Sequence, residues 1–313
     1  MRNKVLNLGV LKMKLYAPNY YKQFNCIADK CTHSCCVGWE IDIDDRTAEK
    51  YAVLSSSYGE YIRKSIAYDG TRHFRLLDSQ KCPHLNAQGL CNVILNAGED
   101  YLCDICREHP RFYNKTSHGV EVGIGMSCEE SCRIILSSDE YLNFSHIGEV
   151  DGECDTTFDA VSLRGEIYEI ISHASLSYGE ILSKIQSKFE ISPSELSDSE
   201  WNDVLTSLDY LDEKNRERFS AYSSASAKEA APDSVLKRAL AYFIFRHCSP
   251  AQNESEFKAA LGLSLFLERL IASVSRAEAA RSIPEIIEIA RTVSEEIEYC
   301  EENTDSIKLE FLF

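Results

Sequence analysis

Cysteine is the residue type whose number and spacing could do chemistry in this chain. It occurs thirteen times, and eleven of these positions lie between Cys26 and Cys154. The opening residues, MRNKVLNLGVLK, lack the apolar stretch and the small-residue cleavage site of a secretory signal, so we expect the thiols to remain reduced. Clustered reduced thiols indicate metal binding, because thiolates are soft donors and four of them can enclose a zinc ion or an iron–sulfur cluster.

The clustered cysteines follow an ordered pattern with short spacings. A short loop brings two sulfurs to one ion at a small entropic cost. Cys35 and Cys36 are adjacent and seldom chelate one ion together, so we expect them to reach different partners or one of them to be structural. The isolated Cys154, Cys248 and Cys300 fit small buried residues instead. The full pattern is Cys26-x4-Cys31-x3-Cys35-Cys36, Cys82-x8-Cys91, Cys103-x2-Cys106 and Cys128-x3-Cys132.

Other side chains with possible chemistry are histidines and an acidic run. His33, His84 and His109 lie near cysteines in the sequence and are candidate ligands. The alternative is that each packs or forms hydrogen bonds, which is the more common role of such a histidine. The stretch from Glu295 to Glu302 contains five glutamates that could receive a cationic lysine, although a solvated surface is the ordinary interpretation of such a run.

The overall composition excludes several classes of protein. The 313 residues are 44% hydrophobic and 27% charged, as in a globular protein, and their net charge is −17. A general nucleic-acid-binding protein needs a basic surface, so we expect no nucleic-acid partner. No run of about 18 apolar residues occurs, which predicts no membrane span and a cytoplasmic protein. The acidic balance favours cationic partners such as lysine-bearing protein surfaces.

The cysteine-rich part is predicted to contain only short elements, and these must position the thiols. Gly38–Asp44 alternates apolar and acidic residues, which is typical of a half-buried strand. Gly123-Ile124-Gly125 indicates a turn or a strand end rather than a cofactor-binding loop. We further expect helices over 47–61, 99–108 and 129–136, and a turn over 86–89.

The rest of the chain is predicted to be largely helical. Apolar residues recur at helical spacing over 235–247 and over 257–274. Ser282-Ile283-Pro284-Glu285 fits a capping box that opens a third helix towards Cys300. The small-residue stretch 223–231 is expected to be a connector.

These patterns together predict a mainly α protein. An irregular Cys-rich metal-binding module with a few short strands is followed by an α-helical domain. The polar, acidic stretch 137–155 is the expected boundary between the two. We therefore expect an N-terminal extension over 1–12, a Cys-rich metal-binding domain over 13–136 and an α-helical domain over 155–313.

Several segments of the chain resemble the flagellin lysine N-methylase family. In the helical part these are Tyr242–His247 and Glu296–Asn303, so the resemblance covers nearly the whole chain. The cysteine-rich part also resembles a broader group of zinc- or iron-chelating domains that contain a Cys-Cys pair. Its resembling segments are Phe24-Asn25-Cys26 through Cys36-Val37-Gly38-Trp39, Cys82-Pro83-His84-Leu85, Gly89-Leu90-Cys91, Cys106-Arg107 with Pro110-Arg111, and Ser127-Cys128-Glu129-Glu130.

The resemblance points to eight family cysteines as metal ligands. Cys103 and Cys132 stand where a small residue is expected in the family and are left out, and His84 and His109 stand where an aromatic is more usual. Eight thiols exceed the needs of one four-cysteine site, so either two centres form or some thiols are not direct ligands. The family context favours a [4Fe–4S] cluster, and zinc is the alternative. The eight are Cys26, Cys31, Cys35, Cys36, Cys82, Cys91, Cys106 and Cys128.

The resemblance also implies a function. It implies a metal-cluster-containing lysine N-methyltransferase that moves a methyl group from S-adenosylmethionine to flagellin or a similar lysine-bearing protein. The residues show no strand followed by a Gly-rich cofactor loop, and Cys36 directly after Cys35 breaks the Cys-x3-Cys-x2-Cys spacing of radical S-adenosylmethionine enzymes. Catalytic and donor-binding residues are therefore not assigned. The alternative is a non-catalytic zinc- or iron–sulfur-binding protein with a structural or redox-sensing role.

Overall fold

A computed structural model describes residues 12–154, 156–191, 196–223 and 231–312. Apart from Lys12, the expected N-terminal extension lies outside the described residues, as does most of the connector over 223–231. The fold is mainly helical with a few short strands, which confirms the expected fold class. Within the described ranges, no helix is both long and apolar enough to cross a bilayer.

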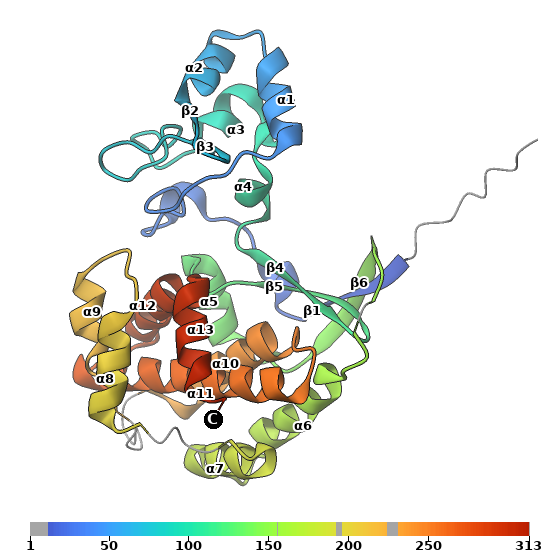
Figure 1. Cartoon of the computed structure of the whole chain (residues 1–313), viewed down its shortest axis with the longest axis vertical. Coiled ribbons are helices and arrows are strands. Elements are labelled where there is room, and N and C mark those ends of the chain that lie inside the picture. The colour runs from blue at the N-terminus through green and yellow to red at the C-terminus, as the bar shows by residue number, and fades with distance from the viewer. Residues whose placement is uncertain (1–11, 155, 192–195, 224–230, 313) are drawn as a thin grey trace, which may run out of the picture.

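A four-stranded sheet occupies the middle of the molecule (Figure 1). β1 runs parallel to β5 and antiparallel to β6, and β4 forms a hairpin with β5. β5 is buried along its whole length, because the helices cover it. In spatial order the strands are β4 (Arg111–Thr116), β5 (Gly119–Ile124), β1 (Lys12–Pro18) and β6 (Phe144–Asp151).

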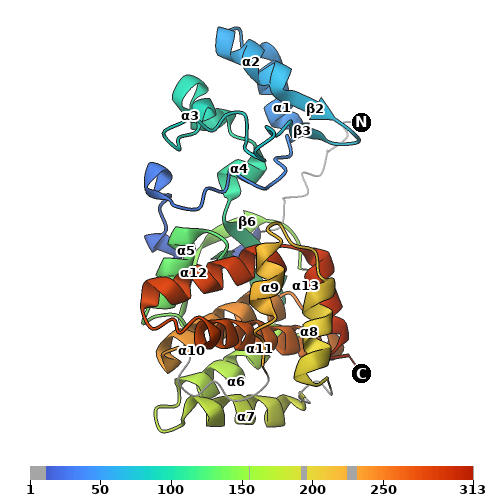
Figure 2. The same ribbon diagram turned by 90° about the vertical axis from the view of Figure 1, so that its left-hand side faces the viewer.

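The chain leaves the sheet after β1 to form a small lobe that projects to one side (Figures 1 and 2). We call residues 21–110 the Cys-rich lobe. Its own hydrophobic core is built around Ile41, Ile43, Tyr51 and Ile62. Its elements are η1 (Tyr21–Gln23), η2 (Ala28–Lys30), α1 (Asp45–Val53), α2 (Ser57–Ser65), β2 (Ile66–Tyr68), β3 (Arg72–Phe74), α3 (Asn92–Ala97), η3 (Glu99–Tyr101) and α4 (Asp104–Glu108).

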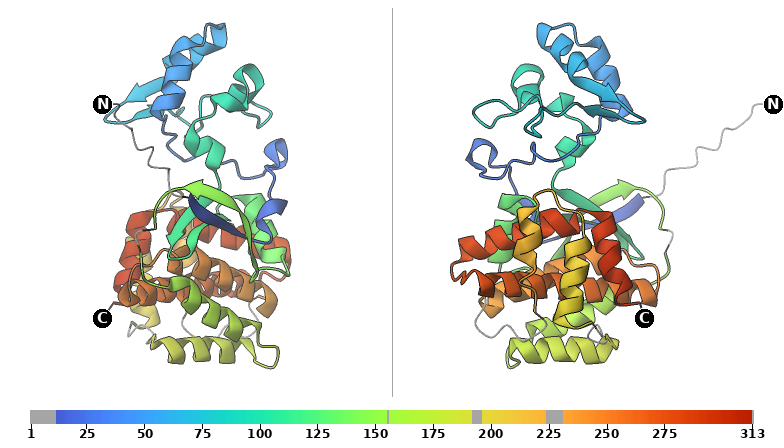
Figure 3. Two further views of the ribbon diagram at one scale, coloured as in Figure 1. Left: turned by 90° about the vertical axis from the view of Figure 1, so that its right-hand side faces the viewer. Right: turned by 60° about the vertical axis from the view of Figure 1, so that its left-hand side comes forward.

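The remaining helices form the body on the other side of the sheet (Figures 2 and 3). The long helix α11 (Glu254–Ala277) runs through its centre and packs against α10, α12 and α13. Two short π-helical turns, η4 and η5, interrupt the helical geometry directly after α10 and α12. The other body elements are α5 (Glu129–Ser137), α6 (Ala160–Ser172), α7 (Tyr178–Phe189), α8 (Asp198–Ser207), α9 (Lys214–Phe219), α10 (Asp233–Phe243), η4 (Ile244–Cys248), α12 (Ile283–Val293), η5 (Ser294–Glu298) and α13 (Glu301–Leu309).

Local sequence signals explain several helix starts. The predicted capping box is confirmed: the Ser282 hydroxyl accepts from the Glu285 backbone N–H, and the Glu285 carboxylate accepts from the Ser282 N–H at 2.8 Å. α7 and α8 begin with the same arrangement. Each such cap contributes about 1 kcal/mol, since it satisfies N–H groups that the first helical turn leaves unpaired. The helices predicted over 129–136 and 257–274 are confirmed, and that over 235–247 ends in η4.

Three predicted elements of the lobe need correction. The strand expected over Gly38–Asp44 is wrong: only Asp42 forms a single bridge, to His73. The alternation of apolar and acidic residues instead reflects burial, because Ile41 and Ile43 belong to the lobe core. The helix expected over 47–61 is two helices, α1 and α2, and that over 99–108 divides into η3 and α4. The turn over 86–89 is confirmed.

Gly123 and Gly125 mark the end of β5, as predicted, and packing requires both. A Cβ on Gly123 would lie 2.2 Å from the ring of Phe112, and one on Gly125 would lie 1.7 Å from the hydroxyl oxygen of Tyr299. Both distances are far below van der Waals contact. A side chain at either position would therefore push the sheet away from the body.

The large core takes in residues from both sides of the boundary expected at 137–155. Ile124, Met126 and Ile135 are buried together with the apolar residues of α10 and α11. A buried ion pair also joins the sheet to α6, because Arg164 donates to both carboxylate oxygens of Glu121 at 2.6 and 2.7 Å. The division into domains over 13–136 and 155–313 stays a prediction.

Candidate metal centre

The first group of thiols lies where the Cys-rich lobe meets the body. Cys26 and Cys35 are exposed, and Cys31 and Cys128 are half-buried. Burial, with smaller contributions from Glu129 and Cys128, raises the pKa of the Cys31 thiol to about 11. Burial also raises the pKa of Cys128, with a further rise from the charge of Cys26. We call Cys26, Cys31, Cys35 and Cys128 the outer thiol group.

The carboxylate of Glu129 holds the two halves of the outer thiol group together. It accepts hydrogen bonds from the backbone N–H and the hydroxyl of Thr32, both at 2.7 Å, and from the N–H of His33 at 3.2 Å. The Cys31 thiol lies 3.5 Å from the same carboxylate. Because Glu129 follows Cys128 directly, these bonds fix the Cys31 loop beside the start of α5.

The second group of thiols lies inside the Cys-rich lobe. Its members are Cys36, Cys82, Cys91 and Cys106, which we call the inner thiol group. Cys82 is buried, and Cys36 and Cys106 pack against the lobe core. The backbone N–H of Cys82 donates to the carbonyl of Cys36 at 2.8 Å, and Cys91 forms a bridge to Leu85. Burial raises the pKa of Cys82 to about 12, and the charges of Cys36 and Cys91 add to this rise.

Cys103 lies with the inner thiol group although the sequence analysis leaves it out of the ligand set. Its thiol forms a hydrogen bond with that of Cys106 and lies 3.5 Å from the Tyr51 hydroxyl. In the sequence, the Cys103-x2-Cys106 spacing is the signal that could have placed Cys103 beside Cys106. Cys132 lies elsewhere, in the large core, with its thiol 3.5 Å from the carbonyl of Ile287.

Cys35 and Cys36 connect the two groups. Hydrogen bonding between these neighbouring thiols lowers the pKa of Cys36 to about 7 and raises that of Cys35. The charges of Cys26 and Cys128 also contribute to the raised pKa of Cys35. The two adjacent thiols thus contact each other, and the expectation that they reach different partners stays a prediction.

No three thiols of the described residues lie as close together as a single metal ion needs. Tetrahedral zinc with Zn–S bonds of about 2.3 Å holds its sulfurs roughly 3.8 Å apart. Among the described residues, the ligand atoms that lie within 4.8 Å of one another in a group of three belong to Glu40, Asp69 and His73, and to no set of thiols. A multi-iron cluster separates its cysteines more widely, because each sulfur binds a different iron.

The three candidate histidines have other partners or surroundings. The Nε2 atom of His33 lies 2.9 Å from the carboxylate of Glu288. His84 is buried between the hydroxyls of Tyr58, at 2.8 Å, and Ser65, at 3.0 Å. Burial lowers the pKa of His84 to about 4, and it does the same for His109. His84 is therefore a neutral packing residue of the lobe, which is the ordinary role considered for it.

A buried polar network lies directly beneath the outer thiol group. Glu298, whose side chain is 0% exposed, accepts a hydrogen bond from the Tyr242 hydroxyl at 2.8 Å. Arg246 lies 3.2 Å and His247 3.4 Å from the same carboxylate. The Tyr242 hydroxyl in turn accepts from the backbone N–H of Met126, two residues before Cys128.

The two π-helical turns place this network. Arg246 and His247 lie on η4, and Glu298 lies on η5. A π-turn inserts one extra residue into a helix and rotates the side chains after it, and such turns occur frequently at functional sites. The family-like segments Tyr242–His247 and Glu296–Asn303 therefore meet in space, which no local sequence signal predicted.

Aromatic contacts extend this network to the lobe. The guanidinium of Arg246 lies 4.8 Å from the ring centre of Tyr299, and Tyr299 contacts Trp39 edge to face at 5.8 Å. Trp39 belongs to the Cys-rich lobe, three residues after Cys36. The lobe and the body are thus joined by the outer thiol group and by this stack.

The acidic run at the C-terminal end is not a free surface for lysine. Glu296 and Glu298 are both buried, and Glu296 accepts from the backbone N–H groups of Leu211 and Asp212. Glu295 lies 2.6 Å from Arg291. Only Glu301 and Glu302 are exposed. The hypothesis that the whole run receives a cationic substrate is therefore not supported.

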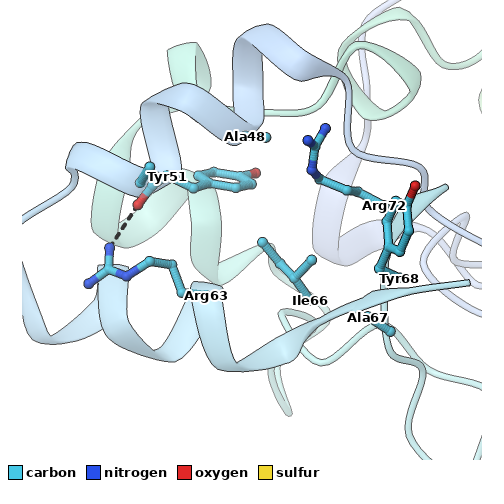
Figure 4. Close-up of a pocket in the computed structure, with 8 residues that line it drawn as sticks. Ala48, Tyr51, Arg63, Ile66, Ala67, Tyr68 and Arg72 are labelled. Carbon is cyan, nitrogen blue, oxygen red and sulfur yellow. Dashed lines mark hydrogen bonds between the residues drawn. The ribbon is translucent and has the colours of Figure 1, made fainter. Parts of the chain in front are cut away.

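A hollow of about 480 Å³ lies in the Cys-rich lobe between α1 and the β2–β3 hairpin (Figure 4). Tyr51 and Tyr68 line it together with the guanidinium groups of Arg63 and Arg72. Arg63 also donates to the carbonyl of Tyr51 at 2.7 Å, so it braces α1 against α2. Two arginines repel a cationic side chain, so this hollow does not suit a substrate lysine.

Comparison with known proteins gives partial matches. A protein named lysine-N-methylase from Salmonella typhimurium is 28% identical over 142 residues, which are 41% of this chain and 34% of that protein. The flagellar biosynthetic protein FliU of Salmonella muenchen is 27% identical over 131 residues, which are 38% of this chain and 75% of FliU. No protein-family model matches the chain, and no solved structure matches it.

Over part of its length, the chain is thus similar to proteins named lysine-N-methylase and to FliU. The matched part spans about a third of the length of the named lysine-N-methylases, at 34% of each.

Proposed function

We propose that the chain is a metal-containing protein lysine N-methyltransferase that acts on flagellin or a similar lysine-bearing protein. The supporting observation is that all eight family-like cysteines are free thiols, in a chain similar over part of its length to proteins named lysine-N-methylase. S-adenosylmethionine is the proposed methyl donor, since methylases of this kind require an activated methyl group. An iron–sulfur cluster is the proposed resident metal, with zinc as the alternative.

The thiols fit such a group by chemistry. All eight proposed ligands are free cysteines, and thiolates are the usual ligands of iron–sulfur clusters. Bound there, an iron–sulfur cluster supplies electron transfer or Lewis acidity next to the body. Cys26, Cys31, Cys35 and Cys128 would hold it at the junction, and the Glu129 hydrogen bonds would keep the first three close to the last.

The protein's own contribution to methyl transfer is positional. The substrate amine must lose its proton and be held in line with the methyl group. Glu298 accepts from the Tyr242 hydroxyl and lies 3.2 Å from Arg246, so we assign this network the role of fixing the junction.

The test is direct methyl transfer. Metal-replete protein is incubated with isotope-labelled S-adenosylmethionine and purified flagellin, and labelled lysines are mapped by mass spectrometry. We expect label on surface lysines of flagellin, and its loss with a Cys128→Ser variant. A lysine-free protein of similar charge serves as the control substrate. No label on flagellin or on a panel of lysine-rich proteins would count decisively against the proposal.

The inner thiol group, of which Cys82 is buried and the others are half-buried, supports a second candidate function. Thiols packed against a hydrophobic core suit a structural or redox-sensing metal protein without catalytic activity. That candidate predicts metal binding and metal-dependent folding with no transfer of label. The same experiment therefore separates the two functions.

A further inference from the structure

We propose that the Cys-rich lobe binds a divalent metal ion outside its cysteines, through Glu40, Asp69 and His73. Among the described residues, these three bring one imidazole nitrogen and two carboxylates together, with ligand atoms that all lie within 4.8 Å of one another. No cysteine belongs to this group. The site is additional to the proposed thiol-bound metal, and it does not depend on methyl transfer.

The distances between the ligand atoms suit a single ion. The Nδ1 atom of His73 lies 3.2 Å from the carboxylate of Glu40 and 3.5 Å from that of Asp69. A metal ion with bonds of about 2.1 Å to nitrogen and oxygen holds neighbouring ligands roughly 3.0 to 3.5 Å apart, from octahedral to tetrahedral angles. The three side chains are thus spaced as the ligands of one ion are.

The Nδ1 atom of His73 gives independent support. It is buried and has no hydrogen-bond partner, although two carboxylates lie beside it. Because neither contact is an aligned hydrogen bond, an ion pair with protonated histidine does not account for the arrangement. A neutral imidazole offers a lone pair at Nδ1, and one cation in front of it satisfies the nitrogen and both carboxylates together.

The backbone holds the three ligands in place. His73 lies on β3, and Asp69 lies in the turn that joins β2 to β3. The backbone N–H of Phe74 donates to the carbonyl of Ile41 at 3.0 Å, which fixes the segment that carries Glu40 beside β3. The ligands therefore come from segments that are already joined by hydrogen bonds, so little ordering is needed when an ion binds.

The surroundings leave the site accessible and its carboxylates available. The side chains of Glu40 and Asp69 are 60% and 70% exposed, so an ion can enter from solvent and keep water in its remaining positions. Arg72, the sequence neighbour of His73, pairs instead with Asp45. Its guanidinium therefore does not take the place of the metal.

The ligand types indicate which ions fit. Two carboxylates balance the charge of a divalent cation, and an imidazole nitrogen favours a transition metal over calcium or magnesium. Mn²⁺, Fe²⁺ and Zn²⁺ accept this combination of nitrogen and oxygen. Mn²⁺ is the most selective probe, because soft thiolates bind it poorly and the cysteines will not compete for it.

The experiment is a Mn²⁺ titration of the metal-replete full chain, followed by the electron paramagnetic resonance signal of free Mn²⁺. We expect one Mn²⁺ per chain, and binding weaker by about tenfold or more in Glu40→Gln and in Asp69→Asn. Both substitutions change exposed side chains, so the fold should be kept. Glu60→Gln and Asp78→Asn are the matched controls, since each removes an exposed carboxylate of the lobe that lies outside the group.

Thermal stability is the second measurement. An ion that binds only the folded chain stabilises it, so Mn²⁺ should raise the thermal midpoint of the wild type and of both controls. The midpoints of Glu40→Gln and Asp69→Asn should not rise. The proposal is overturned if the wild type leaves the free Mn²⁺ signal unchanged, or if either ligand variant binds Mn²⁺ as tightly as the wild type does.

Discussion

The carboxylate of Glu129 and the backbone N–H of Thr32 form a 2.7 Å hydrogen bond across the junction of lobe and body. Each residue directly follows a cysteine of the outer thiol group, Cys128 and Cys31. The bond therefore sets the separation of two sulfurs that are far apart in the sequence, and it does so without itself contacting a metal.

Replacing Glu129 with alanine should weaken metal binding by the outer thiol group. The Thr32 and His33 N–H groups lose their acceptor, and the loop that carries Cys31 becomes free to move away from α5. We expect several-fold faster loss of metal to a chelator, followed by absorbance. Glu130→Ala is the matched control, because Glu130 also lies in the first turn of α5 but bonds only Arg133. Equal rates in the two variants would contradict this role of Glu129.

Removing the charge of Glu298 should destabilise the body strongly. In Glu298→Gln, Arg246 stays buried but loses its carboxylate partner, and breaking a buried ion pair in this way costs about 3 kcal/mol or more. The measurement is the free energy of unfolding from urea titration. Glu295→Gln is the control: its side chain is 25% exposed and its partner Arg291 keeps Glu288, so we expect a loss below about 1 kcal/mol. A Glu298→Gln variant as stable as the control would show that the network is dispensable.

A methyl group at Gly125 should separate the sheet from the C-terminal helices. Its Cβ would overlap the Tyr299 hydroxyl, whereas a Cβ on Gly165, within α6, meets nothing within 4 Å. We expect Gly125→Ala to lower the unfolding free energy by about 2 kcal/mol or more and to shift Trp39 fluorescence. Gly165→Ala should instead stabilise the protein by up to about 1 kcal/mol, since alanine is the better helix former. Similar thermal midpoints for the two variants would refute this account of Gly125.

Glu268 should make stability fall with pH. It is 1% exposed on α11, and burial raises its pKa to about 7. Arg269 and the Tyr178 hydroxyl oppose this rise, and Asp233 adds to it. Between the unfolded value near 4.5 and about 7, the folded chain holds a proton that the unfolded chain has released, so stability decreases with pH across this window.

Glu268→Gln removes that titration. The difference in unfolding free energy between variant and wild type should grow by about 3 kcal/mol from pH 4.5 to 7 and then stay level, because each unit of pKa shift corresponds to about 1.4 kcal/mol. Urea titrations at several pH values measure it. A difference that does not change with pH would mean that Glu268 has an ordinary pKa.

Part of this fold follows from local sequence signals. The Ser282–Glu285 capping box and the apolar period of 257–274 each correspond to a helix because caps and helical spacing depend on neighbouring residues. The strands β1 and β6 were missed. In β1, the buried Met13 between two exposed lysines is a weak sign of the alternation that is typical of a strand. In β6, most side chains of Phe144–Asp151 are exposed, so its sequence resembles that of a polar linker.

The candidate site could be predicted only in its residue types. Cysteine spacing along the chain suggests candidate metal ligands but not which of them lie together, because that depends on the long-range contacts of Glu129 and on the bond between Cys82 and Cys36. The same holds for Glu298, whose place beside Tyr242 depends on two π-turns in separate helices. Its acidic neighbours made it resemble a solvated surface residue.

The Cys-rich lobe is inserted in the chain between two strands of the sheet, β1 and β4. Its small hydrophobic core is separate from the large core of the body. A change that disrupts only the small core should therefore leave the packing of the large core in place.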